Sequence, residues 1–510
     1  MLRWAMIVLA MLPFQILLVQ HLASGGATGF LQYDSPYYVA NGRAVFERGN
    51  GFAHPNPYDP DPASPAIYFH WLTWLLGFGV KILGADPGAV FVVVGLIGAL
   101  ACSALTLRLV ETVLPGPRLR WPLFLLTMWG GGALCVGAVV FNGARGTPLL
   151  EKLFAFDPAD GWWFLNWGRN LVSPMEAVYH ALAAAMWLGV LRQQWRLALG
   201  AAGAFAATHP FSGLEQLLIL VAWLGVLAWR ERNAETWRRL AVAAAMLAAF
   251  GFYYFWFLEK FPAYRELRAE WSIEWILPVA TLLLASGPVA AVAAWRLYRE
   301  RGRWSDRERF LLVAGAVVLL LAKHDWFIAA RQPVHFAHGY NWLPLWLIAL
   351  PQLQTWAGDL GRVRSRLAAV GVGALVAGFA VSDNALFLFK ECREGQANRI
   401  LLTRDQREVF AWIDRAKLHG VLLCADPRLS YLSATYAGVR PYYGHFHNTP
   451  EIFRRRREVA AWNRCGEKGA WLDSIDYLLI ERAKPPVAFD WPNWRELYRN
   501  GDYVLLGRPS

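Results

Sequence analysis

The sequence has little charge for its length. Only 17% of its 510 residues are Asp, Glu, Lys or Arg, whereas 56% are hydrophobic and 27 are Trp. A water-soluble chain of this length would carry far more charge and would divide into several domains. The low charge therefore argues against an ordinary soluble enzyme, and the recurring apolar runs indicate a polytopic membrane protein.

Motifs of common soluble enzymes are also missing. The chain contains no CxxC, Walker loop, GxGxxG or HExxH pattern. The net charge of +12 is explained by arginines in short loops, and no basic stripe predicts nucleic-acid binding. Cysteine is scarce as well, and its spacing leaves open whether one disulfide forms among Cys392, Cys424 and Cys465.

Apolar runs are the dominant feature of what is present. A helix that crosses a membrane needs about 20 mostly apolar residues. The runs predict a mainly α-helical membrane bundle of 11 crossings in residues 1–384. The predicted crossings are 4–22, 88–110, 122–141, 174–191, 197–209, 212–229, 240–258, 276–295, 310–329, 342–357 and 366–383.

Arginines between the runs predict the topology. They follow every second crossing, for example at Arg118, Arg192, Arg230 and Arg364, and Arg3 precedes the first crossing. Since such loops face the cytoplasm, the N-terminus is predicted inside and the C-terminus outside. This alternation of inner and outer loops holds only if the apolar segment 67–83 lies on the outer surface without crossing the membrane.

The outer side then holds the long loop 23–87, which contains the segment YDSPYYVANGRAVF. Its carboxylate, Asp34, is predicted to act as a general base close to the membrane. The alternative is that Asp34 only caps the helix that follows, because Asp is a favourable N-cap residue. Tyr37, Tyr38 and Arg43 are predicted to bind substrate beside it.

From about residue 385 the pattern changes to alternating helices and strands. TRDQREVFAWIDRA and IFRRRREVAAWN are typical of helices, and GVLLCADPR and SIDYLLIER are typical of buried strands. ELYRNGDYVLLG predicts a hairpin with an Asn-Gly turn. Residues 385–510 are therefore predicted to form a small extracytoplasmic α/β domain, whose cluster YYGHFHNTPE is rich in polar and aromatic groups.

These residues resemble a family. YDSPYYVANGRAVFERGNGF and SPAIYFHWLTWLLG are similar to the first outer loop of GT-C glycosyltransferases, a group that includes protein O-mannosyltransferases and the lipid A aminoarabinose transferase. TYAGVRPYYGHFHNTPEIFRRRREV resembles the C-terminal domain of uncharacterised bacterial members. The resemblance implies an inverting enzyme of the cell inner membrane. It would move sugar from a polyprenyl-phosphate donor to a glycan, lipid or protein acceptor at the outer face, with Asp34 as base.

Other polar residues are candidates for substrate binding. The predicted crossing 197–209 gives only about 20 Å of helix, less than the roughly 30 Å hydrocarbon core. Its end, THPFSGLE, should therefore lie below the membrane surface, where ionisable groups are candidates for function. A buried structural hydrogen bond is the alternative for these groups, and a turn or an interface anchor is the alternative for the loop residues. The candidates are Asp157, Arg169, Glu176, His180, His209, Glu215 and Arg331.

Other functions and a metal remain open at this point. A transporter or lipid flippase would show internal repeats, which we do not find, and a third alternative is a relative that binds glycan or lipid without catalysis. No cofactor is required by the sequence. A divalent metal is left open, although His335 and His338 alone are too few to define its site.

Overall fold

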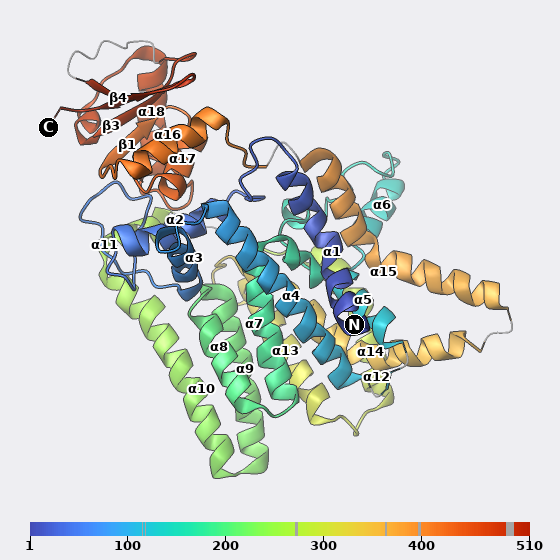
Figure 1. Cartoon of the computed structure of the whole chain (residues 1–510). Helices are drawn as coiled ribbons and strands as arrows, with labels where there is room; N and C mark the ends of the chain where they lie inside the picture. Colours follow the sequence, from blue (N-terminus) through green and yellow to red (C-terminus); the bar gives the residue numbers. More distant parts are fainter. Residues whose placement is uncertain are drawn as a thin grey trace. The chain divides into compact units, whose positions relative to one another are not determined.

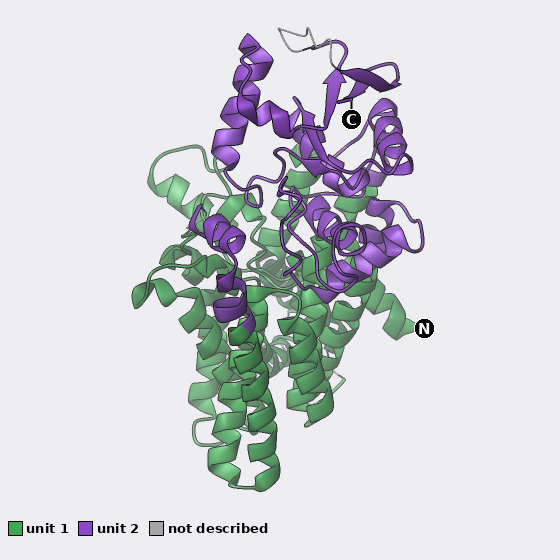
Figure 2. Cartoon of the chain, turned by 90° about the vertical axis from the view of Figure 1, so that its left-hand side faces the viewer, with its two compact units in different colours: residues 1–20, 94–252, 273–397 green, residues 21–93, 253–272, 398–510 purple. Residues whose placement is uncertain are grey.

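The computed structural model describes residues 1–114, 116–117, 119–270, 274–362, 365–395, 399–485 and 494–509. The chain divides into two compact units, which Figure 2 shows in different colours. Unit 1 comprises residues 1–20, 94–252 and 273–397, and unit 2 comprises residues 21–93, 253–272 and 398–510. Unit 2 therefore combines the whole of the predicted outer loop 23–87 with most of the predicted C-terminal domain 385–510. Arg118, Arg364 and Ser510 lie outside the described residues.

Unit 1 is a helical bundle. Several of its helices begin with proline at the first position, as at Pro174 and Pro210, where the missing N–H is not needed and the fixed φ angle suits a helix. Its helices, with most of α4, are α1 (Leu2–Leu22), α4 (Pro87–Val113), α5 (Arg120–Trp129), α6 (Leu134–Ala144), α7 (Pro174–Leu191), α8 (Trp195–Ala206), α9 (Pro210–Glu231), α10 (Ala234–Phe252), α12 (Val279–Arg299), α13 (Asp306–Ala322), α14 (Trp342–Leu360) and α15 (Arg366–Glu394).

These helices pack mainly on their neighbours in sequence. Helix α7 packs on α8, α8 on α9, and α9 on α10 and α13, as can be followed in Figure 1. Helix α12 packs on α14. The predicted break in THPFSGLE is confirmed, because α8 ends at Ala206 and α9 begins at Pro210, with the His209 ring capping the Ser212 N–H at 3.2 Å.

The number of membrane crossings differs from the sequence prediction. Among the described residues, seven helices are long and apolar enough to span a membrane, or eight if the pair α5 and α6, bent by 61°, forms one span. The expected eleven therefore exceed what these helices support. Helix α8 has 12 residues and α13 has 17, which give only about 18 and 26 Å of helix. The mainly helical membrane architecture is confirmed.

Unit 2 contains the shorter helices and the sheet. Helix α3 has 11 residues and is not among the candidate spans of the described residues. Helix α2 packs on α3, and Gly42 and Gly77 leave no room for a Cβ where the two backbones meet. The helices are α2 (Ser35–Glu47), α3 (Trp71–Lys81), α11 (Pro262–Glu270), α16 (Arg404–Arg415), α17 (Pro427–Tyr436) and α18 (Ile452–Cys465).

A mixed sheet of five strands forms the centre of the C-terminal part, in the order β2-β1-β3-β5-β4. Strand β1 is parallel to β2 and β3, and β5 is antiparallel to β3 and β4. Its buried strands are apolar, as predicted, and cover a core that includes Ile452, Trp462 and Leu478. The strands are β1 (Val421–Cys424), β2 (Arg440–Pro441), β3 (Tyr477–Glu481), β4 (Arg495–Arg499) and β5 (Tyr503–Gly507).

Candidate functional site

Asp34 lies immediately before α2 in unit 2. Its side chain makes no capping hydrogen bond to the helix that it precedes, so capping does not account for its carboxylate. The side chain is 63% exposed, and Oδ1 lies 2.9 Å from Nε2 of His445, whose side chain is 3% exposed. The structure thus pairs an accessible carboxylate with a buried imidazole from a segment 411 positions away.

The surroundings of His445 determine which ring nitrogen carries the proton. The backbone N–H of His447 points at Nδ1 over 3.2 Å, and the Asn448 amide lies 2.9 Å from the same atom. A backbone N–H only donates, so Nδ1 must accept and the neutral ring carries its proton on Nε2. His445 therefore donates to Asp34, which orients the carboxylate and leaves its second oxygen without a bond to His445.

Four tyrosines surround the His445 ring. The ring centroids of Tyr33, Tyr37, Tyr58 and Tyr431 lie 5.0–5.7 Å from it. The Tyr431 hydroxyl also donates to the Tyr33 carbonyl over 2.5 Å and accepts from the Tyr37 N–H over 3.1 Å. Burial raises the pKa of Tyr431 well above its usual range, so the phenol stays protonated. This hydroxyl fixes the backbone on both sides of the carboxylate.

The predicted residues Tyr37 and Tyr38 occupy this region. Tyr37 lies against the His445 ring, and the Tyr38 ring lies 5.5 Å from that of Tyr37 and 6.3 Å from that of His70. These contacts place Tyr38 behind Tyr37 within the same aromatic group. Tyr37 therefore lies beside the ring that donates to Asp34, and Tyr38 lies next to Tyr37, while their role in substrate binding stays a prediction.

Arg43, also predicted to bind substrate, is engaged by the protein instead. Its guanidinium is buried and bonds to Glu47 and Asp414. It also donates to the carbonyls of Thr435 and Tyr436 over 3.2 and 2.8 Å. These contacts connect α2 with α16 and α17, so the side chain holds unit 2 together and its donors have protein acceptors.

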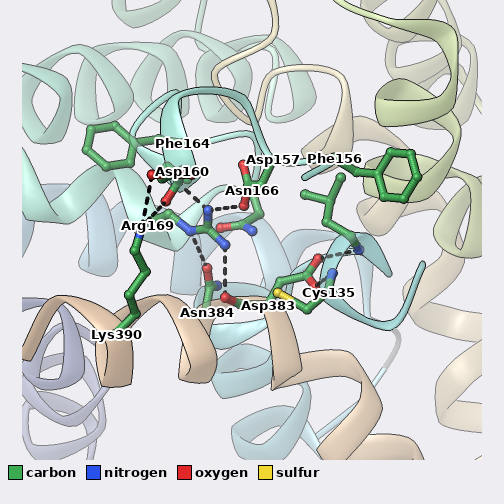
Figure 3. A network of polar contacts seen from close by, with 12 residues as sticks. Cys135, Phe156, Asp157, Asp160, Phe164, Asn166, Arg169, Asp383, Asn384 and Lys390 are labelled. Atoms are coloured by element: carbon green, nitrogen blue, oxygen red, sulfur yellow. Dashed lines mark hydrogen bonds and ion pairs between the residues drawn. The ribbon is translucent and has the colours of Figure 1, made fainter. Parts of the chain in front are cut away.

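Asp157 and Arg169 form a buried ion pair in unit 1, shown in Figure 3. The Arg169 Nη1 lies 2.6 Å from the carboxylate, and both side chains have no exposed surface. The guanidinium also donates to Asn384 Oδ1, the Asp383 carbonyl and the Gly161 carbonyl over 2.9–3.1 Å. All of its nitrogens therefore have acceptors. This arrangement suits a side chain that joins α15 to the loop containing Asp157 better than one that contacts a phosphate.

The remaining predicted residues of the bundle come together in a second part of unit 1. Glu176 and Glu215 both interact electrostatically with Tyr340, whose ring stacks on His180 at 4.7 Å. His209 lies 5.8 Å from His335, ring centre to ring centre. We call this set, with His338, the histidine cluster.

Several buried atoms of the histidine cluster have no hydrogen-bond partner among the described residues. They include Glu215 Oε2, His335 Nδ1 and both ring nitrogens of His338. Buried ionisable side chains thus gather beside THPFSGLE. Arg331 lies apart from it, because its side chain is exposed and its N–H donates to His324 over 2.8 Å.

A metal site and a disulfide were both left open by the sequence. In the described part of the chain, no group of three or more His, Cys, Asp or Glu side chains is arranged to hold a metal ion. None of the five cysteines, all of which lie among the described residues, forms a disulfide, so Cys392, Cys424 and Cys465 are not joined to one another.

His445 and Tyr431 are the site residues that sequence reasoning missed. YYGHFHNTPE stood out as a polar and aromatic cluster, which was the available signal for His445. Nothing local connected it with Asp34. Tyr431 lies in PRLSYLSATY, which has no clear apolar period and gave no signal.

The candidate spans and the likeness to solved structures indicate an integral membrane protein with a GT-C-like fold. Two crystal structures of the Archaeoglobus fulgidus oligosaccharyltransferase match with TM-scores of 0.52 and 0.53 at 12% sequence identity. One is tethered to an acceptor peptide with an NVT sequon and the other is a complex with Zn and sulfate. They cover 94% and 93% of this chain and 69% and 68% of the archaeal chain.

ArnT from Cupriavidus metallidurans bound to undecaprenyl phosphate matches with a TM-score of 0.49 at 12% identity. The match covers 98% of this chain and 97% of that chain. No protein-family model matches the sequence, and no curated protein matches it.

Proposed function

We propose that this chain is a membrane glycosyltransferase that moves sugar from a polyprenyl-phosphate donor to an acceptor hydroxyl at the outer face. The observation that carries the proposal is the Asp34–His445 pair, an exposed carboxylate oriented by a buried neutral imidazole. The similarity to the archaeal oligosaccharyltransferase supports the fold class. The acceptor would be a glycan, lipid or protein.

In this proposal Asp34 is the general base. The acceptor oxygen attacks C1 of the sugar, the bond from C1 to the phosphate oxygen breaks, and the acceptor proton passes to the carboxylate. His445 is a positioning residue, because it donates to one carboxylate oxygen and leaves the other for the acceptor. Tyr37 offers an aromatic face and a polar tip, which suit a sugar ring.

The proposed topology places the N-terminus in the cytoplasm and residues 385–510 outside the inner membrane. It follows from the arginine loops, which the positive-inside rule assigns to the cytoplasm. Reporter fusions at Gly84 and after the last residue should both report an external location. A cytoplasmic signal at Gly84 would contradict the proposed parity.

Transfer itself is tested with the purified protein in detergent or nanodiscs. We expect consumption of a polyprenyl-phosphate sugar and release of polyprenyl phosphate, followed by mass spectrometry. Comparing glycolipids and glycans of a deletion strain with those of its parent would identify the product. Movement of the lipid between leaflets of proteoliposomes, with no change in its sugar, would instead support the flippase alternative.

A further inference from the structure

Arg48 directly follows α2 and has an unusual environment. Its Nε, Nη1 and Nη2 atoms are all buried, and none has a hydrogen-bond partner among the described residues. Its backbone N–H closes the helix by donating to the Ala44 carbonyl over 3.1 Å. A buried guanidinium without acceptors is costly, because the charge has lost its water and gained no compensating hydrogen bonds.

The carboxylate next to Arg48 is already in use. Glu47 accepts from Arg43 over 2.6 Å and pairs with Lys81 over 2.7 Å. Arg43 is held in addition by Asp414 and two carbonyls. Both of these ion pairs use Oε1 of Glu47, whereas its Oε2 is buried and has no hydrogen-bond partner. Within the described residues Glu47 forms no ion pair with Arg48.

A second guanidinium, that of Arg440, acts on Arg48 through its charge. Arg440 is half-buried on β2, and no hydrogen bond or ion pair of its side chain is found in the described part of unit 2. Burial and the charge of Arg440 lower the pKa of Arg48 to about 10. Burial lowers the pKa of Arg440, and the charges of Asp59, Asp61 and Asp476 oppose this change. The two positive charges therefore repel one another.

We propose that Arg48 and Arg440 bind an oxyanion, such as a phosphate group, carried by the acceptor. Guanidinium groups present paired N–H donors that match phosphate and carboxylate oxygens. Arg48 follows α2 and Asp34 precedes it, so the backbones of the two residues lie about 20 Å apart along the 13-residue helix. That separation fits an extended acceptor whose hydroxyl is near Asp34 and whose anionic group is near Arg48.

The assignment to the acceptor depends on the proposed glycosyl transfer, whereas the anion site itself does not. A free phosphorylated acceptor and an anionic lipid headgroup offer the same chemistry. Both sources are therefore compared with the full-length protein. Sodium phosphate and pyrophosphate are titrated in detergent at constant ionic strength, and nanodiscs of phosphatidylglycerol are compared with nanodiscs of phosphatidylcholine.

The readout is the thermal midpoint of unfolding, which a ligand of the native state raises in a saturable way. We expect such a rise with phosphate or pyrophosphate for the wild type. For Arg48→Met and Arg440→Met the apparent affinity for the anion should be at least about tenfold weaker. Arg454→Met is the matched control, because Arg454 is paired with Glu451 and Glu458 in the same unit. The control should respond like the wild type.

Stability without anion separates binding from a structural role. Arg48→Met removes a buried charge that has no partner, so its midpoint should equal or exceed that of the wild type. A lower midpoint with an unchanged anion response would overturn the proposal. A rise confined to phosphatidylglycerol would reject the acceptor and assign the site to a lipid. Anion binding that depends on Arg48, in a protein that transfers no sugar, would retain the site and refute the proposed function.

Discussion

Asp34→Asn should lower sugar transfer by about two to four orders of magnitude, which is the usual loss when a general base is removed. Folding should be unchanged, because the Asp34 side chain is mostly exposed and makes no helix-capping bond. The asparagine carbonyl can still accept the bond from His445, so the geometry is kept and the base is lost. Initial rates with purified protein, together with melting curves, measure both effects.

Two further variants make this experiment specific. Asp86→Asn is the control, since this carboxylate accepts from the Gly88 and Ala89 N–H groups at the start of α4 and has no proposed part in transfer. His445→Ala should lower kcat by about tenfold or more with little change in KM, because it removes a bond to a charged group. Normal transfer by Asp34→Asn would exclude the base, and loss of folding would point to a structural carboxylate.

Arg169→Met should destabilise the protein by about 3–5 kcal/mol, the usual effect of removing one partner from a buried ion pair. The change leaves the Asp157 carboxylate buried and uncompensated, and it deprives Asn384 and two carbonyls of their donor. Reversible unfolding in mixed micelles measures the free energy, and a large loss of expressed protein is expected alongside it.

Two controls accompany this prediction: the loss of an exposed ion pair in the same unit, and a second substitution at the partner of Arg169. Arg362 is also an arginine of unit 1, but its pair with Asp359 is exposed, so Arg362→Met should change stability by less than about 1 kcal/mol. Adding Asp157→Asn to Arg169→Met should recover part of the loss. An Arg169→Met protein that folds normally and fails to bind a lipid phosphate would instead favour the substrate-binding role predicted from the sequence.

The C-terminal part was largely predictable because its signals are local. TRDQREVFAWIDRA has a strong helical period and became α16, and the apolar runs in GVLLCADPR and SIDYLLIER became β1 and β3. The Asn-Gly hairpin is present between β4 and β5. Strand β2 has only two residues and was missed, since two residues show no alternation. Helix α17 was missed because its sequence is polar and aromatic.

The crossings and the arginines show where local signals end. Apolar composition identified α8 and α13 as crossings, yet the helices are short because the caps and turns that end them matter as much as composition. Arg43 and Arg169 were predicted to bind substrate, and in the structure both guanidinium groups are bonded to protein acceptors. Whether such a side chain meets a phosphate or four protein acceptors depends on segments distant in sequence, as with Asp157 and Asn384, and only the folded chain reveals this.

The Tyr431 hydroxyl, which bonds to the backbone at Tyr33 and Tyr37, makes the module around Asp34 discontinuous in the gene. Homologous recombination that replaced only residues 398–510 would bring in a segment from another protein. Its side chains would then have to bond to the backbone at Tyr33 and Tyr37 in place of Tyr431. A viable chimera must therefore exchange 21–93 and 398–510 together, and natural variation in the two segments should be inherited as a matched pair.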